Sequence, residues 1–162
     1  NRTIENGWQH CFTFPREIYV KDGIPCQRPV RELEEKCRLL RKDQGHMEIE
    51  GYPVYQAEIS GICNNRFQAV LGEELVLEYR DGQFEMWFKN QEKTGVSAGR
   101  GRRWVDMERL ENVKILADIS SAEVFLNDGE YVFSTRYYPE KAVIHIKAPG
   151  AEIVFKEIAA KK

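Results

Sequence analysis

The sequence is poor in the features that mark membrane-spanning and nucleic-acid-binding proteins. None of its apolar runs approaches the roughly 20 residues that cross a bilayer as a helix, so no membrane contact is expected. Its 24 basic and 26 acidic residues nearly balance, which gives a net charge of −2 and a pI near 6.0. A general nucleic-acid binder would be basic, so the short basic run at 99–103 is interpreted as solvated surface.

Cysteine and histidine are few and scattered, with no Cys-x-x-Cys pair and no neighbouring histidines. They are Cys11, Cys26, Cys37, Cys63, His10, His46 and His145. Zinc sites need ligands at characteristic close spacings, so neither a metal nor another cofactor is expected. We predict four reduced, mostly buried thiols, which fits an intracellular protein.

The length of 162 residues is that of one domain, and a hydrophobic content of 42% is typical of a globular protein. The chain opens at Asn1 without a methionine, so we expect the natural product to be longer. The lack of a leader peptide therefore says little about location. A cytoplasmic location is expected, and secretion stays open.

Short β-type runs separated by turns dominate the sequence beyond residue 45. Strands are expected at 46–50, 55–62, 67–71, 74–80, 83–88, 102–106, 112–118, 121–127, 130–137, 142–147 and 153–157. Many short strands joined by turns rather than helices predict an all-β fold, a two-sheet antiparallel β-sandwich.

The first 44 residues follow a different pattern. Strands are expected at 9–14, 17–20 and 24–28, and Pro29 opens a helical stretch that reaches about residue 42. Val30, Leu33, Cys37 and Leu40 share one face of that helix, with acidic residues early and basic residues late. We thus predict one short N-terminal helix within a joining segment, 1–44, packed on a sandwich, 45–162, as one structural domain.

The most informative segment runs from Asp118 to Glu130. Polar and apolar residues alternate over 121–127, as in a strand with one buried face, and Asp128-Gly129 suits a tight hairpin turn. The resulting register sets Leu126 opposite Tyr131, Val124 opposite Phe133, Ala122 opposite Thr135 and Glu123 opposite Ser134. Glu123 should then pair with the diagonal Arg136, while Asp118 braces the turn at Ser120-Ser121.

Two stretches carry a resemblance to a known family. Asp118-x-Ser120-Ser121-x-Glu123-x-Phe125-x-Asn127-Asp128-Gly129-Glu130, with Thr135-Arg136 and Pro139, resembles the C-terminal β-sandwich of glycoside hydrolase family 32, the sucrose, sucrose-6-phosphate and fructan hydrolases. Gly7-Trp8, Phe14 to Ile18, Lys21-Asp22-Gly23, Gln27 to Val30 and Glu32-Leu33 are similar to the segment joining that family's catalytic propeller to its sandwich. Residues 45–110 are similar only in strand pattern.

The resemblance implies an accessory domain without catalytic residues. The family's catalytic motifs, Asn-Asp-Pro, Arg-Asp-Pro and Glu-Cys, belong to the propeller, and this sequence has neither an Asp-Pro nor a Glu-Cys dipeptide. Asp118 and Glu123 could be taken for the carboxylate pair of a retaining glycosidase, but structural roles are preferred for both. The implied partner is the propeller of the same polypeptide, in a bacterial sucrose or sucrose-6-phosphate hydrolase.

Several residues are candidates for contact with the propeller or with sugar. They are Trp8, Arg16, Trp87, Trp104 and Phe125. Aromatic side chains of this kind either pack at an interface or stack on a sugar ring. Two alternatives therefore stay open, namely a free-standing module that binds fructan weakly and a subunit-assembly module that forms a homodimer.

Overall fold

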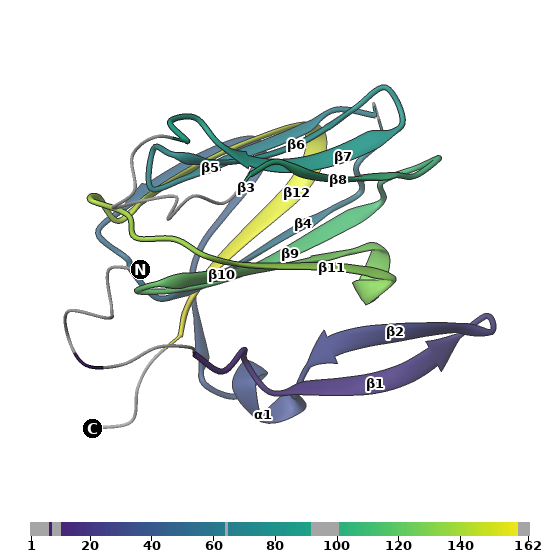
Figure 1. Ribbon diagram of the computed structural model, residues 1–162, viewed down its shortest axis with the longest axis horizontal. Coiled ribbons are helices and arrows are strands. Elements are labelled where there is room, and N and C mark those ends of the chain that lie inside the picture. Colours follow the sequence, from purple (N-terminus) through teal and green to yellow (C-terminus); the bar gives the residue numbers. More distant parts are fainter. Residues whose placement is uncertain (1–6, 8–10, 64, 92–100, 159–162) are drawn as a thin grey trace.

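The computed structural model of the protein describes residue 7 and residues 11–63, 65–91 and 101–158. Within these ranges, short strands follow one another with little helix (Figure 1). In chain order the elements are β1 (Arg16–Lys21), β2 (Ile24–Pro29), α1 (Arg31–Glu34), β3 (Cys37–Glu50), β4 (Tyr55–Ser60), β5 (Phe67–Leu71), β6 (Leu75–Arg80), β7 (Gln83–Phe88), β8 (Arg103–Asp106), β9 (Asn112–Asp118), β10 (Ser121–Leu126), the 3₁₀ turn η1 (Asn127–Gly129), β11 (Tyr131–Arg136) and β12 (Val143–Ile158).

The strands form two packed layers that share their longest strands. In the lower layer of Figure 1 the order is β11-β10-β9-β4, continued by the second half of β12. In the upper layer the first half of β12 pairs with β5, and β6, β7 and β8 follow. All these pairings are antiparallel, and alternate side chains of both layers meet in one apolar core. The predicted antiparallel β-sandwich is confirmed.

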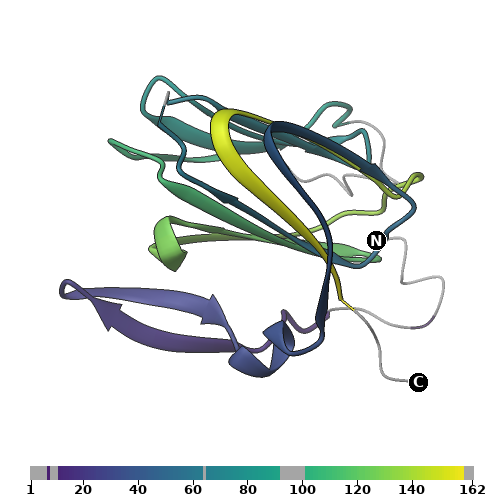
Figure 2. The same cartoon turned by 180° about the vertical axis from the view of Figure 1, so that it is seen from behind.

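The long antiparallel pair of β3 and β12 joins the two layers. Figure 2 shows both strands bending over together from the upper layer to the lower one. Their register shifts between Lys147 and Glu152, and Gly45 takes a φ of +76° opposite this break. Glycine tolerates such a backbone without strain, so the bend lies where the side chain is smallest.

The predicted short N-terminal helix is present, but it is much shorter than the expected stretch from Pro29 to about residue 42. The helix α1 covers just Arg31–Glu34, and β3 begins at Cys37 and runs without a break across residue 44. Helical propensity is a weak preference that tertiary context overrides. Here β12 supplies a strand partner along almost the whole of β3. Upstream, residues 11–14 are not in a strand either, and 8–10 lie outside the described residues.

The four cysteines are free, but they are not mostly buried as predicted. Cys26 is buried and Cys37 is half-buried, whereas Cys11 and Cys63 are exposed. Both exposed cysteines lie in connecting segments rather than strands, so no sheet face covers them. Within the described residues, no helix has the length and apolar character needed to cross a bilayer.

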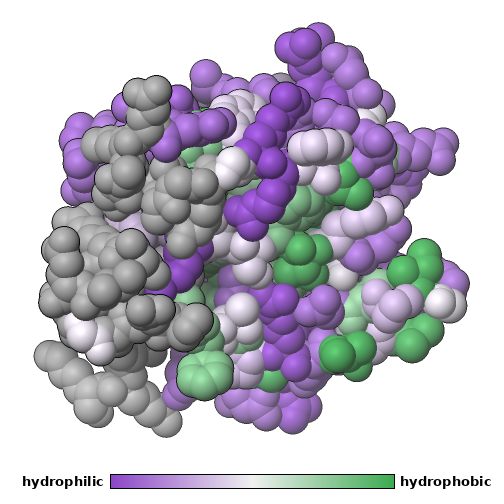
Figure 3. Space-filling model, viewed as in Figure 1, coloured by the Kyte–Doolittle hydropathy of each residue, from purple (hydrophilic) through white to green (hydrophobic). Residues whose placement is uncertain are grey.

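The β1–β2 ribbon lies outside the sandwich, beneath the lower layer (Figure 1). On the side that faces the sandwich, the Tyr19 hydroxyl donates a hydrogen bond to the Asp128 carbonyl in the hairpin of β10 and β11. Cys26 lies on the same side and is buried. Ile18 and Val20 alternate with Tyr19 and remain exposed, as does Ile24 at the ribbon's far end. Apolar residues gather over this ribbon at the lower right of Figure 3. Ile18 and Val20 are called the ribbon strip below, whereas Ile24 lies opposite Lys21, on the Tyr19 side of the ribbon.

Candidate functional site

The hairpin of β10 and β11 has the register that its sequence predicts. Leu126 lies opposite Tyr131, Val124 opposite Phe133 and Glu123 opposite Ser134. Leu126 and Val124 are fully buried in the core. The alternation and the turn thus set this local geometry together.

The turn η1 is held from two sides. Asn127 accepts a hydrogen bond from the Glu111 backbone N–H at 2.8 Å and donates one to the Arg109 carbonyl at 2.8 Å. On the ribbon side, Gly129 has a φ of +88°, and a Cβ there would lie 1.7 Å from the Gln27 carbonyl oxygen. No other residue type fits this close approach of two backbones.

The outer face of β10, which carries the polar residues of the alternation, is also buried. Glu123 is 1% exposed and Phe125 is 2% exposed, because the ribbon and the chain before it cover them. We call this face, formed by Leu116, Glu123, Phe125 and Ser134, the docking face. A carboxylate buried to this degree requires a charged or hydrogen-bonding partner.

That partner is Arg16, at the start of β1. Its Nε and Nη2 donate to Oε2 of Glu123 at 3.0 Å and 2.6 Å, and the Phe14 backbone N–H donates to Oε1 at 2.7 Å. Arg16 also donates to Gln27 and Ser134, and its guanidinium lies 5.3 Å from the centre of the Phe125 ring. The carboxylate therefore fastens the ribbon to the sandwich.

The predicted ion pair between Glu123 and Arg136 is wrong. Arg136 is diagonal to Glu123, as expected, but its guanidinium lies 5.2 Å from the centre of the Tyr138 ring. Arg16 reaches Glu123 instead, from 107 residues away in sequence. A pattern confined to one hairpin carries no signal for a partner supplied by a distant strand.

Asp118 has a local role. Its Oδ1 accepts a hydrogen bond from the Ile119 backbone N–H at 2.7 Å, so it braces the β9–β10 turn one residue earlier than the expected Ser120-Ser121. Glu123 is covered by Arg16, so no substrate can reach it. The two carboxylates are thus engaged separately, Glu123 by Arg16 and Asp118 by the backbone of a turn.

A second attachment, which sequence reasoning missed, joins α1 to the lower layer. Glu34 accepts from Lys114 at 2.6 Å, from Lys156 at 3.3 Å and from Gln56 at 3.0 Å. Glu58 contacts the same two lysines at 3.0 Å and 2.9 Å. The sequence shows alternating charges in these strands, but it does not show that Lys114, Glu58 and Lys156 lie side by side, because this depends on the sheet order β9-β4-β12.

The network changes the acidity of Glu34. Burial alone raises the pKa of this carboxyl, but hydrogen bonds from Lys114 and Gln56 and the charges of Lys114 and Lys156 outweigh it. The pKa falls from the usual 4.5 to about 2. Glu34 therefore stays ionised over the whole neutral and mildly acidic range, and it holds α1 against the sheet.

Two of the remaining candidates lie apart from the docking face. Trp87 and Trp104 lie on β7 and β8 of the upper layer, Trp87 half-buried and Trp104 60% exposed. Trp8 lies outside the described residues. Among the residues that the structure describes, no group of three histidine, cysteine, aspartate or glutamate side chains could hold a metal ion.

Comparison with known proteins finds curated relatives that are much longer than this chain. The chain is 34% identical over 150 residues to a raffinose invertase of Escherichia coli, covering 85% of this chain and 31% of that protein. It is 28% identical over 148 residues to a sucrose-6-phosphate hydrolase of Bacillus subtilis, covering 85% of this chain and 30% of that protein. The chain thus spans about a third of the length of these relatives.

Solved structures show the same fold. A sucrose-6-phosphate hydrolase from Lactobacillus gasseri matches 98% of this chain and 36% of its own, with a TM-score of 0.78 and 16% identity. A glycoside hydrolase family 32 structure from Bifidobacterium adolescentis matches 91% of this chain, with a TM-score of 0.74 and 20% identity. The family described as glycosyl hydrolases family 32 C terminal matches residues 54–162. Because this match covers well over half of the chain, the protein belongs to glycoside hydrolase family 32, as a C-terminal domain of that family.

Proposed function

We propose that the protein is the non-catalytic C-terminal β-sandwich of a β-fructofuranosidase that hydrolyses sucrose or sucrose-6-phosphate. Its role is to stabilise the catalytic propeller of the same polypeptide. The observation that carries this proposal is the buried Arg16–Glu123 pair, which fixes the ribbon to the sandwich while the ribbon strip faces outward. The names of the relatives support the choice of substrate.

The docking face holds residues 14–16 against the sandwich. Glu123 binds both the Arg16 side chain and the Phe14 backbone, and the Pro15 carbonyl accepts from the Val30 backbone N–H at 3.1 Å. A joining segment held in this way transmits the position of the sandwich to the domain that precedes it. A flexible linker would leave the two domains free to move independently.

The ribbon strip supplies the surface for the propeller. Ile18 is 78% exposed and Val20 is 71% exposed, and Phe12 just upstream is fully exposed. Burial of such a side chain stabilises a contact by roughly 1.5–3 kcal/mol. Exposed apolar groups on the segment nearest to the neighbouring domain are typical of an interface.

Catalysis belongs to the propeller in this proposal. Glu123 is committed to Arg16 and Asp118 to a turn, so neither acts as nucleophile or acid. We also place the protein in a reducing compartment, the bacterial cytoplasm. The four free cysteines support this location, since exposed thiols such as Cys11 and Cys63 oxidise readily outside the cell.

A chimera tests the proposal. The C-terminal third of the E. coli raffinose invertase is replaced by this chain, and sucrose hydrolysis and the half-life of activity at raised temperature are measured. We expect the chimera to be active and to outlast the invertase truncated before that third, whereas the isolated chain releases no fructose. The proposal fails if the truncated enzyme is as durable as the chimera, or if the isolated chain hydrolyses sucrose and a Glu123→Gln change abolishes this activity.

The same chimera tests the ribbon strip. Val20→Ser should shorten the half-life of activity, because it removes apolar contact with the propeller. Ile119→Ser is the matched control, since Ile119 is 69% exposed and lies in the β9–β10 turn, away from the ribbon. Equal effects of the two changes would show that the ribbon strip is not the propeller contact.

A further inference from the structure

The outer face of the upper layer carries a row of polar side chains that ends at an exposed tryptophan. The row crosses five strands in register, from Trp104 on β8 to Glu85, Glu78, Gln68 and Lys147 on β12. Neighbouring strands are about 4.8 Å apart, so five positions span about 19 Å, the length of several sugar rings in a chain. We call these five residues the polar row.

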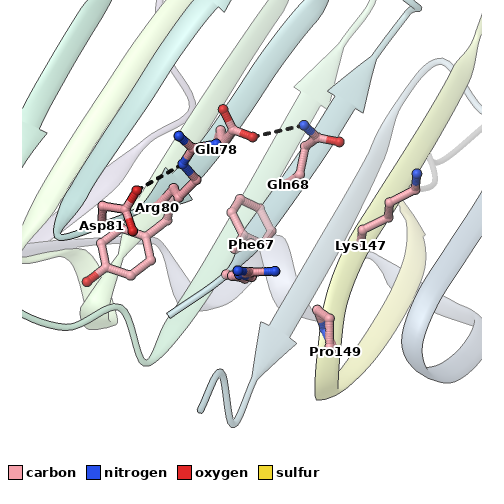
Figure 4. A pocket seen from close by; sticks show the side chains of 9 residues that line it. Phe67, Gln68, Glu78, Arg80, Asp81, Lys147 and Pro149 are labelled. Atoms are coloured by element: carbon pink, nitrogen blue, oxygen red, sulfur yellow. Dashed lines mark hydrogen bonds and ion pairs between the residues drawn. The ribbon is translucent and has the colours of Figure 1, made fainter. Parts of the chain in front are cut away.

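The polar row is hollowed rather than flat. A hollow of about 420 Å³ lies over β5 and β6. Gln68 and Glu78 point toward each other there, and Lys147 lies on the opposite side of Gln68 from Glu78 (Figure 4). A second hollow of about 420 Å³ adjoins it, sharing Glu78, Arg80 and Asp81 and extending to Glu85 and Arg102. We call these two adjoining hollows the groove, and Glu85 at its end is the strand neighbour of Trp104.

The charges in the groove cancel. Its lining has four acidic and four basic side chains, namely Glu78, Asp81, Glu85, Asp106, Arg66, Arg80, Arg102 and Lys147. Several already pair with each other, as Arg80 does with Asp81 at 3.0 Å and Arg102 with Glu85. A groove without net charge gives no electrostatic attraction to phosphate or to an acidic polymer. It suits a neutral ligand that is rich in hydrogen-bonding groups.

The side-chain types narrow the ligand further. Gln68 donates to Glu78 at 3.1 Å and Gln83 donates to Asp106 at 2.7 Å, which holds the amide and carboxylate planes in place. Such fixed groups can still accept and donate to vicinal hydroxyls. The indole of Trp104 is 60% exposed and offers a flat apolar surface at the end of the row.

A protein partner fits this face poorly. The buried cores of protein interfaces are depleted in charged residues, whereas charged side chains line most of this groove. The ribbon strip, on the other side of the molecule, has the apolar character of a protein contact. The polar row lies on the layer that the ribbon does not cover (Figure 1). The two surfaces can therefore act independently.

We propose that the polar row binds a neutral polysaccharide chain, with Trp104 stacking on one sugar ring and Gln68 and Glu78 bonding the hydroxyls of the next rings. This site goes beyond the proposed support of the propeller and does not depend on it. Binding there would hold the protein near a polymeric carbohydrate without any chemical step.

Affinity electrophoresis and titration calorimetry of the protein test this site, with inulin, levan and dextran as neutral probes and polygalacturonate as an acidic one. We expect saturable binding of at least one neutral polymer and none of the acidic polymer. Trp104→Ala should weaken this binding about tenfold or more, and Trp104→Phe should keep most of it. Gln68→Ala should also weaken it, and Ile119→Ala, at an exposed site in the β9–β10 turn, should leave it unchanged.

Three outcomes would overturn the site. They are no binding of any neutral probe, preference for the acidic polymer, and binding that both Trp104→Ala and Gln68→Ala leave intact. Trp104 is exposed, so its replacement should not unfold the protein, and circular dichroism confirms this for each variant. Val20→Ser should leave sugar binding unchanged, which separates this test from that of the propeller contact.

Discussion

Removal of the buried ion pair between Arg16 and Glu123 should release the ribbon and destabilise the whole domain. Glu123 accepts three hydrogen bonds, two from the Arg16 guanidinium and one from the Phe14 backbone. Deleting one partner of a buried pair costs about 3–5 kcal/mol, because the other charge is left without compensation. Arg16 retains 16% side-chain exposure, so water offsets part of this, and we expect about 3 kcal/mol for Glu123→Ala.

A double-mutant cycle separates the pair from its surroundings. Arg16→Ala, Glu123→Ala and the double variant are unfolded in urea, with tryptophan fluorescence as the signal, and hydrogen exchange follows the amides of β1 and β2. The loss in free energy of unfolding in the double variant should be clearly smaller than the sum of the losses in the two single variants, which gives a coupling energy of about 2 kcal/mol. The ribbon amides should exchange faster in all three variants, because the ribbon has lost its attachment.

The same ribbon contains a matched control. Arg28 and Glu17 form an ion pair at 2.9 Å, with side-chain exposures of 59% and 39%. An exposed pair of this kind contributes about 1 kcal/mol or less. If the Arg16–Glu123 coupling is no larger than that of Arg28 and Glu17, or if Glu123 couples to Arg136 instead, the reasoning about the docking face is refuted.

Three further predictions concern the ribbon and its neighbours. Gly129→Ala should lower the free energy of unfolding in urea by about 2 kcal/mol more than Gly23→Ala does. Both glycines have a φ above +80°, but a Cβ at Gly129 would meet the Gln27 carbonyl, whereas a Cβ at Gly23 would meet open space. Equal losses would refute the close approach. The Glu34 pKa drops from 4.5 to about 2 on folding, so the stability that this ionised carboxylate contributes is present above pH 4.5 and is lost as the pH falls toward 2. Glu34→Gln should therefore flatten the fall in the melting temperature between pH 4.5 and pH 2. An unchanged pH profile of the melting temperature would contradict this. The isolated chain should self-associate at high concentration through the exposed ribbon strip, Val20→Lys should weaken this association in sedimentation velocity, and a strictly monomeric wild type would count against it.

Local patterns determined much of this protein from sequence alone. The alternation over 121–127 and the turn after it gave the β10–β11 register residue by residue, because a strand has a period of two and a tight turn sets which residues face each other. Strands at Phe67–Leu71, Gln83–Phe88 and Asn112–Asp118 have their predicted bounds for the same reason. The motif in this hairpin also carried the family resemblance.

Only the tertiary structure decided how distant segments meet. The helical pattern after Pro29 became β3, because β12, more than 100 residues downstream, pairs with it along most of its length. Glu123 pairs with Arg16 rather than with Arg136, because the ribbon packs on the face of β10 that carries Glu123. The alternation in sequence predicts that this face is polar, but it does not predict that the face is buried. Alternation reports which side chains share a face, and burial of that face depends on what packs against it. The sequence by itself therefore determined the hairpin and the family, and the packing of remote strands decided which of its charges hold the domain together.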